Sequence, residues 1–426
     1  MRARVPRWGR AWRSSGVRPM SSSNRAQLMR DGYLVKRDVI PEDQLASLRV
    51  TFETLLDRQR AVWRRERGPD DPPGGIWDSA MQPRLSNTET FIDADTAEAV
   101  EIWVSEPIRG LAAELLDDEH AGISAMQMMC NPTFDYGPAP WHRDIHPIDM
   151  GPMQSMQDSL VEDGPNYMQW NIPLYDDSVF WIVPGSHTRI NTEAENRSLL
   201  ENARVPIPGG EQVELRAGDV LVYVNYLIHW GSRYMSEPTR RTLHGGHTIY
   251  PHWEDLDFTQ HLSAEARGWF ELWAARTARL KDDTERALRA VLDRDGDSYS
   301  KALEALRPGA GAATKLQLTI WLCKAAMHIH NLKRPDYASL PAEFRRRAEY
   351  SHGISLNWGP AFAERFTKPE ADAIWQRFGA LEDHLLAPGG EDYVPGYQSG
   401  PIPYSLERMH AGITVGEFIA SWGHAA

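Results

Sequence analysis

The chain of 426 residues has only two cysteines, Cys130 and Cys323, which stand far apart and without Cys-x-x-Cys spacing. This scarcity argues against a disulfide-stabilised scaffold and against a thiolate zinc site, and it fits a reducing compartment, so we expect a cytoplasmic protein. Long apolar runs are also missing, because the richest stretch, residues 316–326, is short and contains Lys324. A buried helix is therefore predicted there, and no membrane span.

Basic residues are outnumbered by acidic ones outside the N-terminus. The net charge is −13, yet residues 1–30 hold eight arginines and no acid. Without those eight charges the rest of the chain has a net charge of −21. A domain this acidic is a poor partner for nucleic acid or an anionic membrane. We expect residues 1–27 to be a disordered or processed extension, with an organellar transit segment as the alternative.

The remaining chain divides by its periodicity. The apolar residues have the spacing of a helix over residues 41–56 and 97–116. Residues 121–250 instead contain short apolar runs separated by turn residues. Such strands without intervening helices predict a mainly β core, a double-stranded β-helix (jelly roll, cupin-like). We expect this domain, with its N-terminal helices, to cover residues 28–254. Residues 255–426 are predicted to be a helical extension that serves as a lid or an oligomer interface.

One short motif, "WHRDIHP" at residues 141–147, holds His142 and Asp144 two positions apart. Side chains repeat every two residues along a strand, so both point to one side. His229 ends an apolar strand 85 residues after Asp144, and Arg240 follows 11 residues later. Two imidazoles and a carboxylate leave three open positions on a metal, as in non-haem Fe(II) oxygenases. An arginine nearby clamps a carboxylate, and alternation lets only one of Arg240 and Arg241 point inward.

Several segments, in order, carry a family resemblance: "DGYLVKRDVIPEDQLASLR", "HRDIH", "QWNIPLYDD", "VPGSH", "AGDVLVY" and "SEPTRR". Over residues 28–250 the chain resembles the phytanoyl-CoA dioxygenase-like Fe(II)/2-oxoglutarate oxygenases. The resemblance implies that His142, Asp144 and His229 bind iron and that Arg240 binds the 5-carboxylate of 2-oxoglutarate. It also implies an aromatic position beside the co-substrate at Trp170, and a contact to co-substrate or substrate at Gln127.

The implied activity is oxidation, by hydroxylation, of an unactivated C–H bond in a small-molecule metabolite or natural product, with Fe(II), 2-oxoglutarate and O2. Related halogenases lack the ligand carboxylate, so Asp144 favours hydroxylation. The Met-rich loop 145–165 and the helical extension depart from the family pattern, and the acidic body disfavours an acyl-CoA substrate. We expect homo-oligomers, if formed, to use the C-terminal helices.

Two other functions fit parts of the same pattern. One is a non-catalytic jelly-roll protein that binds a metal without turnover, and the other is a cupin-type enzyme that uses a metal without 2-oxoglutarate. An intact triad together with Arg240 counts against the first. Arg240 and Trp170 discriminate against the second, because that chemistry needs no co-substrate clamp. The role of His146 stays open between a site residue and an exposed turn residue. The remaining histidines that attract attention are interpreted as structural: His187, His244, His247, His328 and His330.

Overall fold

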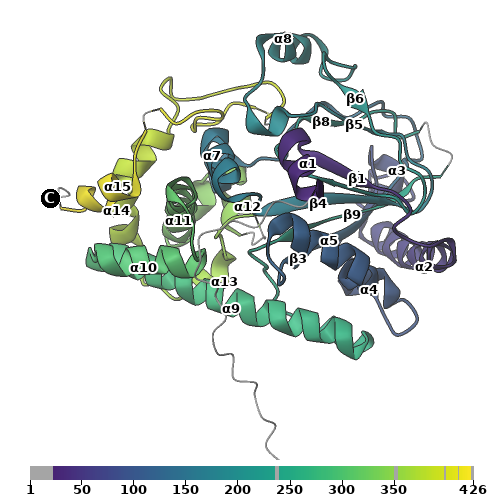
Figure 1. The fold of residues 1–426 in the computed structure, drawn as a ribbon, viewed down its shortest axis with the longest axis horizontal. Helices are drawn as coiled ribbons and strands as arrows, with labels where there is room; N and C mark the ends of the chain where they lie inside the picture. Colours follow the sequence, from purple (N-terminus) through teal and green to yellow (C-terminus); the bar gives the residue numbers. More distant parts are fainter. Residues whose placement is uncertain (1–22, 236–238, 350–353, 398–399, 411, 424–426) are drawn as a thin grey trace, which may run out of the picture.

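The computed structural model describes residues 23–235, 239–349, 354–397, 400–410 and 412–423. Two antiparallel sheets form the core of these ranges, and the helices of the C-terminal third gather beside them (Figure 1). The predicted fold class, a double-stranded β-helix with N-terminal helices and a helical C-terminal region, is confirmed.

The larger sheet has six strands that pair in the order β1-β7-β4-β9-β3-β2, every pair antiparallel. In that spatial order the strands are β1 (Tyr33–Lys36), β7 (Val220–Tyr223), β4 (Tyr167–Pro173), β9 (Arg241–Thr248), β3 (Gly122–Cys130) and β2 (Arg84–Leu85). The smaller sheet, in the order β6-β5-β8, is made of β6 (Glu211–Gln212), β5 (Phe180–Ile182) and β8 (His229–Gly231).

Strand β4 shows how alternation divides the side chains between two environments. Gln169 and Asn171 line a cavity between the sheets, whereas Met168, Trp170 and Ile172 are fully buried on the other face. Because side chains alternate along a strand, one face of the larger sheet packs against helices and the other is left for the site.

Helices of the N-terminal half cover the outer face of the larger sheet (Figure 1). They are α1 (Ser23–Asp31), α2 (Glu42–Glu66), α3 (Ile76–Ser79), α4 (Glu98–Val104) and α5 (Glu106–Leu116). Residues 97–116 were expected to form one helix, but it breaks at Ser105. Pro107 has no backbone N–H to donate to Trp103, so the hydrogen-bond ladder cannot continue there.

The folded part begins earlier than the expected boundary at residue 28. Residues 23–27 lie in α1, where Arg25 donates to the carbonyl oxygens of Leu115 and Asp163. These bonds attach α1 to α5 and to the end of α7, so residues 23–27 belong to the folded domain rather than to the N-terminal extension. The rest of that extension, residues 1–22, lies outside the described residues.

Three further helices interrupt the β region and seven form the extension. The first set is α6 (Pro147–Met150), α7 (Met153–Asp163) and α8 (Glu193–Asn202). The second is α9 (Ala264–Asp293), α10 (Gly296–Leu306), α11 (Ala312–Leu332), α12 (Ala342–Ala348), α13 (Gly359–Ala363), α14 (Lys368–Leu385) and α15 (Val415–Ser421).

Helix α11 joins the extension to the core. It is buried on most of its surface and packs against α7 and α6 on one side and α14 on the other. This placement explains the apolar stretch 316–326 as a buried helix. None of the helices in the described ranges combines the length and apolarity that a bilayer crossing requires.

Candidate metal centre and its cavity

The two ligand segments pair like strands of a sheet. His142 and His229 form an antiparallel bridge in which each backbone N–H donates to the other residue's carbonyl oxygen at 2.9 Å. Asp144 extends the pairing, since its N–H donates to Asn225 at 2.8 Å and the Asn225 side chain donates back to the Asp144 carbonyl at 2.8 Å. With backbones fixed in this way, the three side chains converge on one point.

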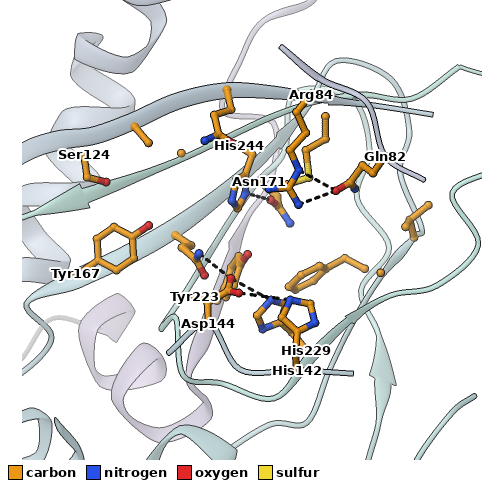
Figure 2. A pocket seen from close by; sticks show the side chains of 18 of the residues that line it. Gln82, Arg84, Ser124, His142, Asp144, Tyr167, Asn171, Tyr223, His229 and His244 are labelled. Carbon is orange, nitrogen blue, oxygen red and sulfur yellow. Dashed lines mark hydrogen bonds and ion pairs between the residues drawn. The ribbon is translucent and has the colours of Figure 1, made fainter. Parts of the chain in front are cut away.

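The three side chains form a compact donor set (Figure 2). Nε2 of His142 lies 3.5 Å from Oδ1 of Asp144, and Nε2 of His229 lies 3.4 Å from Oδ2. One ligand atom from each residue lies within 4.8 Å of the others, so a single ion can contact all three. Among the described residues this is the one group of three or more His, Cys, Asp or Glu side chains with such spacing.

Hydrogen bonds behind the donors fix their orientation. Nδ1 of His142 donates to Pro140 O at 2.8 Å, and Nδ1 of His229 donates to Leu227 O at 2.9 Å. A carbonyl can only accept, so both protons sit on Nδ1 and both Nε2 lone pairs face the centre. Gln169 Nε2 donates to Asp144 Oδ2 at 2.9 Å and holds the carboxylate in place.

The protonation states suit a cation. Burial alone would raise the pKa of Asp144, but the His229 and His142 imidazoles and the Gln169 amide outweigh burial and hold that pKa well below its usual range. Burial, followed by the proximity of His229, lowers the pKa of His142. At neutral pH the centre therefore offers a carboxylate and a neutral imidazole, which are the metal-binding forms of both groups.

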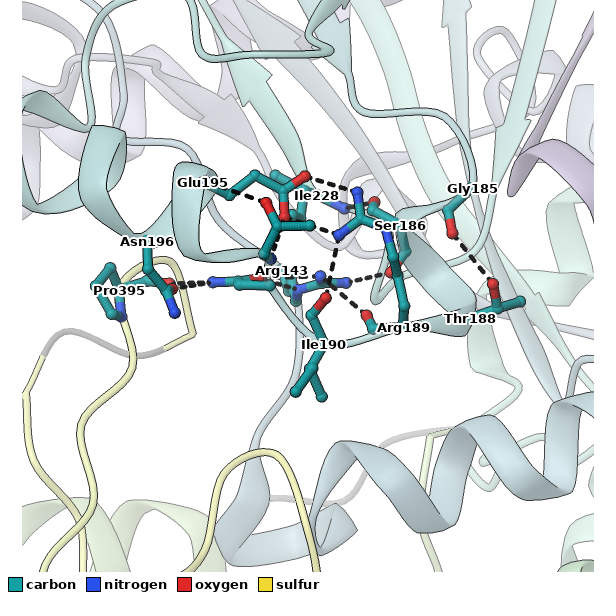
Figure 3. Close-up of polar contacts among 12 residues, drawn as sticks. Arg143, Gly185, Ser186, Thr188, Arg189, Ile190, Glu195, Asn196, Ile228 and Pro395 are labelled. Carbon is teal, nitrogen blue, oxygen red and sulfur yellow. Dashed lines mark hydrogen bonds and ion pairs between the residues drawn. The ribbon is translucent and has the colours of Figure 1, made fainter.

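Arg143, between the two ligands, anchors their segment (Figure 3). Its guanidinium is buried and makes five hydrogen bonds, to the carbonyl oxygens of Ser186, Tyr226 and Arg189 and twice to Asn191 Oδ1. Burial lowers the pKa of Arg143 to about 10, so it remains a cation at neutral pH. It ties the His142–Asp144 segment to the loop that leads into His229.

Ser186, in the "VPGSH" motif, serves both ligand segments. Its carbonyl accepts from Arg143, and its hydroxyl accepts the backbone N–H of Ile228, one residue before His229. Gly185 has a φ of +76°, which lets the chain turn sharply at this point. The motif is therefore a brace behind the metal centre, and the ring of His187 in it donates from Nε2 to Met29 O, outside the cavity.

The C-terminal tail also reaches this anchor. The backbone N–H of Arg143 donates to Gly396 O at 2.8 Å, and Asn191 Nδ2 donates to Pro395 O at 2.9 Å. The ring of Tyr397 lies 5.4 Å from the Arg143 guanidinium. Figure 3 shows the tail passing beside Arg143. Residues 395–397 thus brace the segment that carries two of the three candidate metal ligands.

A cavity of about 300 Å³ opens in front of the donor set, between the two sheets. A polar row crosses the floor of the cavity. His244 on β9 is at its centre, with its register partners Gln127 on β3 and Asn171 on β4 on either side. His244 Nδ1 lies 2.9 Å from Asn171 Oδ1, and burial lowers the pKa of His244 to about 3, so the ring is neutral.

Arg240 lines the cavity and Arg241 does not. Arg240 Nε donates to Asp177 Oδ2 at 2.8 Å, and its Nη1 is buried without a hydrogen-bond partner in the described structure. Arg241 turns the other way, where it pairs with Glu53 and stacks over Trp77. The alternation between neighbours thus leaves Arg240 with a donor atom available inside the cavity.

Trp170 corrects the expectation that it lies beside a co-substrate. Its side chain is fully buried on the face of β4 that points away from the cavity, with its ring 5.0 Å from that of His247. Gly245, its register partner, leaves the space on that face that the Trp103 ring occupies. Gln169 and Asn171, its neighbours in "MQWN", are the cavity residues.

The two histidines in "HGGH", both interpreted as structural from the sequence, differ in their surroundings. His244 and His247 face opposite sides of β9, and only His244 lines the cavity. Its interpretation as purely structural is therefore incomplete. His247 is buried against Trp103 and Trp170, and burial lowers its pKa to about 3.

Several cavity residues escaped the sequence analysis. They are Arg84, Tyr167, Gln169, Tyr223, Tyr234, Arg347 and Ile354. Strand alternation in "MQWN" was a usable signal for Gln169. No local signal marked Arg84, which stands in a Pro/Gly-rich segment, or Arg347, which lies in the extension.

The extension contributes directly to the cavity. Arg347 on α12 lies 2.7 Å from His146 Nδ1 through its Nη2, and 3.4 Å from Asp149. Asp149 in turn pairs with His328 on α11 at 2.7 Å. His146, whose role the sequence left open, and His328, interpreted as structural, therefore lie at the junction between the β core and the helical extension.

Comparison with known proteins matches residues 28–242 to the family model described as phytanoyl-CoA dioxygenase (PhyH). A comparison with characterised protein sequences finds no match.

Three solved structures are similar in fold. AviO1 from Streptomyces viridochromogenes Tue57 is 22% identical, with 55% of this chain and 96% of that chain covered and a TM-score of 0.38. HygX from Streptomyces hygroscopicus, solved with nickel and 2-oxoglutarate, is 16% identical, with 56% and 91% covered and a TM-score of 0.39. EctD from S. alaskensis, solved with 2-oxoglutarate and 5-hydroxyectoine, is 17% identical, with 55% and 78% covered and a TM-score of 0.40.

These three structures are too distant in sequence to indicate the activity of this chain. The family match is different, because it spans half of the chain and includes His142, Asp144, His229 and Arg240. The chain belongs to the phytanoyl-CoA dioxygenase (PhyH) family.

Proposed function

We propose that the chain is an Fe(II)- and 2-oxoglutarate-dependent oxygenase that hydroxylates an unactivated C–H bond of a small-molecule substrate. The observation that carries the proposal is the convergence of His142, Asp144 and His229 at a cavity that also holds Arg240. The intact carboxylate of Asp144 supports hydroxylation as the outcome.

The donor set fits Fe(II). Two imidazole nitrogens and one carboxylate on one side of an ion leave the opposite positions open for a bidentate co-substrate and O2. About a third of the side chains of His142 and Asp144 is exposed to the cavity, whereas His229 is 5% exposed. The ion would thus be held from the protein side and reached from the cavity.

Arg240 fits the distal carboxylate of 2-oxoglutarate. Asp177 engages only Nε of the guanidinium and leaves Nη1 as a buried donor without a partner in the described residues. A buried donor of this kind is costly to leave unpaired, and a carboxylate oxygen satisfies it with a charge-assisted bond. Asp177 is itself satisfied by Val179 N–H and the Thr242 hydroxyl, so it does not need all of Arg240.

Bound iron and 2-oxoglutarate would supply the oxidising power, with decarboxylation of 2-oxoglutarate to succinate. The chain's own part is to orient and to shield. Gln169 fixes the Asp144 carboxylate, and Phe180 and Tyr223 pack against the His229 ring at 5.5 and 5.2 Å and keep water from that side. The cavity is near the lower end of the usual size for ligand sites, about 300–1,000 Å³, which favours a small substrate.

The decisive experiment is co-substrate binding under anaerobic conditions. Wild-type protein loaded with Fe(II) is expected to develop a visible absorption band on titration with 2-oxoglutarate. Arg240→Gln should weaken 2-oxoglutarate binding by about 10- to 150-fold, from the ~1.5–3 kcal/mol of a hydrogen bond to a charged group. Arg241→Gln is the matched control and should leave affinity within about twofold.

Other results identify the competing functions. A wild-type protein that binds Fe(II) but shows no such band is a metal-binding protein of the cupin type or an enzyme that does not use 2-oxoglutarate. Equal effects of Arg240→Gln and Arg241→Gln would refute the assignment of the clamp.

A further inference from the structure

The charges that line the cavity do not balance. The described lining residues include three arginines, Arg84, Arg240 and Arg347, but one carboxylate, Asp144. In the proposed function Asp144 is committed to the metal. A surplus of positive charge on the cavity wall would therefore favour a negatively charged ligand beside the metal and the co-substrate.

Two of the arginines are already paired with acids. Arg240 lies 2.8 Å from Asp177 in a pair of which each side chain is 3% exposed. Arg347 lies 2.9 Å from Glu343 and 3.4 Å from Asp149. Their charges are compensated within the chain.

Arg84 is the exception. Its Nε and Nη2 both donate to one neutral atom, Gln82 Oε1, at 3.2 and 2.9 Å. No acid within 4.0 Å pairs with it in the part of the chain that the structure describes. Two donors on one amide oxygen orient the guanidinium without neutralising it, so Arg84 is held in place and its charge remains available.

The strand pairing turns Arg84 toward the cavity. Arg84 is the register partner of Met129, which also lines the cavity, and paired residues on neighbouring strands face the same side. Figure 2 shows Arg84 and Gln82 across the cavity from His142 and His229. The positive charge of Arg84 is also felt by His244, where it adds to burial in lowering the pKa.

We propose that Arg84 binds a carboxylate of the substrate, so that the substrate is a small organic acid held between Arg84 and the metal centre. This inference rests on the proposed function, because it takes the metal and Arg240 as the sites of the co-substrate. Arg84 is then available to bind the substrate.

The cost of removing water from Arg84 gives the physical reason. Arg84 is exposed at the cavity wall, so a neutral substrate that covered its guanidinium would displace water from an uncompensated charge without supplying a charged partner, which is unfavourable. A carboxylate offers two oxygens that match the planar fork of the guanidinium. Selectivity for an acid over a neutral analogue of the same shape thus follows from the unpaired charge, and the apolar remainder would lie against Phe180, Met129 and the aromatic rings of Tyr167 and Tyr223.

The test uses matched probes that differ in charge and not in shape: benzoate with benzamide, and 3-phenylpropanoate with 3-phenylpropanamide. Zn(II) replaces iron in the full-length protein, with 2-oxoglutarate present, so that no turnover occurs and ligand-observed NMR reports dissociation constants. We expect at least one acid to bind at least tenfold more tightly than its amide. Arg84→Gln should abolish the preference, and Arg84→Lys should keep part of it.

Arg197→Gln is the control, since Arg197 is an exposed arginine on α8 outside the cavity. It should leave the preference unchanged. The proposal is overturned if neither acid is preferred by the wild type, or if Arg84→Gln keeps the preference. It is also overturned if Arg84→Gln weakens 2-oxoglutarate more than tenfold while the probes are unaffected, because Arg84 would then serve the co-substrate. A wild type that fails to bind 2-oxoglutarate refutes the proposed function instead, and the acid preference is then measured on the Zn(II) protein alone.

Discussion

The hydrogen bond from Gln169 to Asp144 offers a direct measure of how the chain prepares its metal centre. Gln169 is 7% exposed and its Nε2 donates to Asp144 Oδ2 at 2.9 Å. In Gln169→Leu the side chain keeps most of its volume but loses the donor. The carboxylate then loses one of the interactions that hold its pKa down and gains freedom to rotate.

The expected magnitude follows from the type of bond. A hydrogen bond to a charged group contributes ~1.5–3 kcal/mol, which corresponds to about 10- to 150-fold in an equilibrium constant. Loss of a partner behind a metal ligand typically weakens metal affinity by about 10- to 100-fold. Both arguments predict that Gln169→Leu weakens Fe(II) or Zn(II) binding by at least about tenfold.

The assay is competition with a chromophoric chelator at pH 7, with thermal unfolding of the metal-free protein as a check on folding. Gln127→Leu is the matched control, because Gln127 lines the same cavity on β3 and makes no hydrogen bond to the three ligands in the described structure. If Gln169→Leu binds metal as tightly as the wild type, or if Gln127→Leu loses as much, the carboxylate does not depend on this bond and the reasoning is refuted.

Two further predictions concern stability. Arg143→Lys cannot serve all the acceptors around Arg143. Leaving two buried carbonyls unpaired at about 1–3 kcal/mol each should lower the free energy of unfolding by about 2–6 kcal/mol in urea denaturation. Arg189→Lys, at an arginine whose side chain is 37% exposed, should change it far less, and equal losses would contradict the anchoring role. Burial lowers the pKa of His247 from 6.5 to about 3, so its neutral form supports folding above pH 6.5 and that contribution is lost as the pH falls from 6.5 toward 3. His247→Leu should therefore flatten the fall of Tm over this interval, and parallel Tm curves for variant and wild type would show that His247 titrates freely.

The sequence predicts the metal centre better than the rest of the cavity, for a physical reason. His142 and Asp144 are two positions apart, so local geometry alone places them together. His229 was expected at the end of an apolar strand, but that strand ends at Tyr223, and His229 begins β8 in the other sheet, where it meets His142 through a backbone bridge. Alternation predicted that only one of Arg240 and Arg241 points inward, the family resemblance implied Arg240, and the structure places Arg240 at the cavity. The inferences that rest on the side-chain period alone are the pairing of His142 with Asp144 and the opposite directions of the two arginines.

Trp170 shows the opposite case. Its proposed place came from the family resemblance, while the alternation of "MQWN" puts Gln169 and Asn171 on one face and Trp170 on the other. If Asn171 is taken as a cavity residue, the two-residue side-chain period of β4 excludes its neighbour Trp170 from the cavity. Local physics was the better guide here than the resemblance.

Arg84 and Arg347 could not be found in this way. Arg84 lies on a strand of two residues whose existence depends on pairing with β3, far along the chain. Arg347 reaches the cavity only because α12 and α11 pack on α6, 200 residues earlier in the sequence. Placement of this kind is decided by tertiary packing, which no local pattern reveals. The helical extension, expected as a lid or an oligomer interface, supplies a wall of the cavity through Arg347 and Ile354.

The brace formed by the C-terminal tail has a consequence for how the protein matures. Gly396 accepts the backbone N–H of Arg143, between the two ligands of the His142–Asp144 segment. During translation this carbonyl is made about 250 residues after Asp144, which at about 5–20 residues per second is a delay of roughly 10–50 s. A nascent chain that has already folded its sheets therefore still lacks a support behind its metal ligands. We therefore expect the contact between Gly396 and Arg143 to form after the contacts among the strands, because residue 396 is synthesised later than every strand of the two sheets.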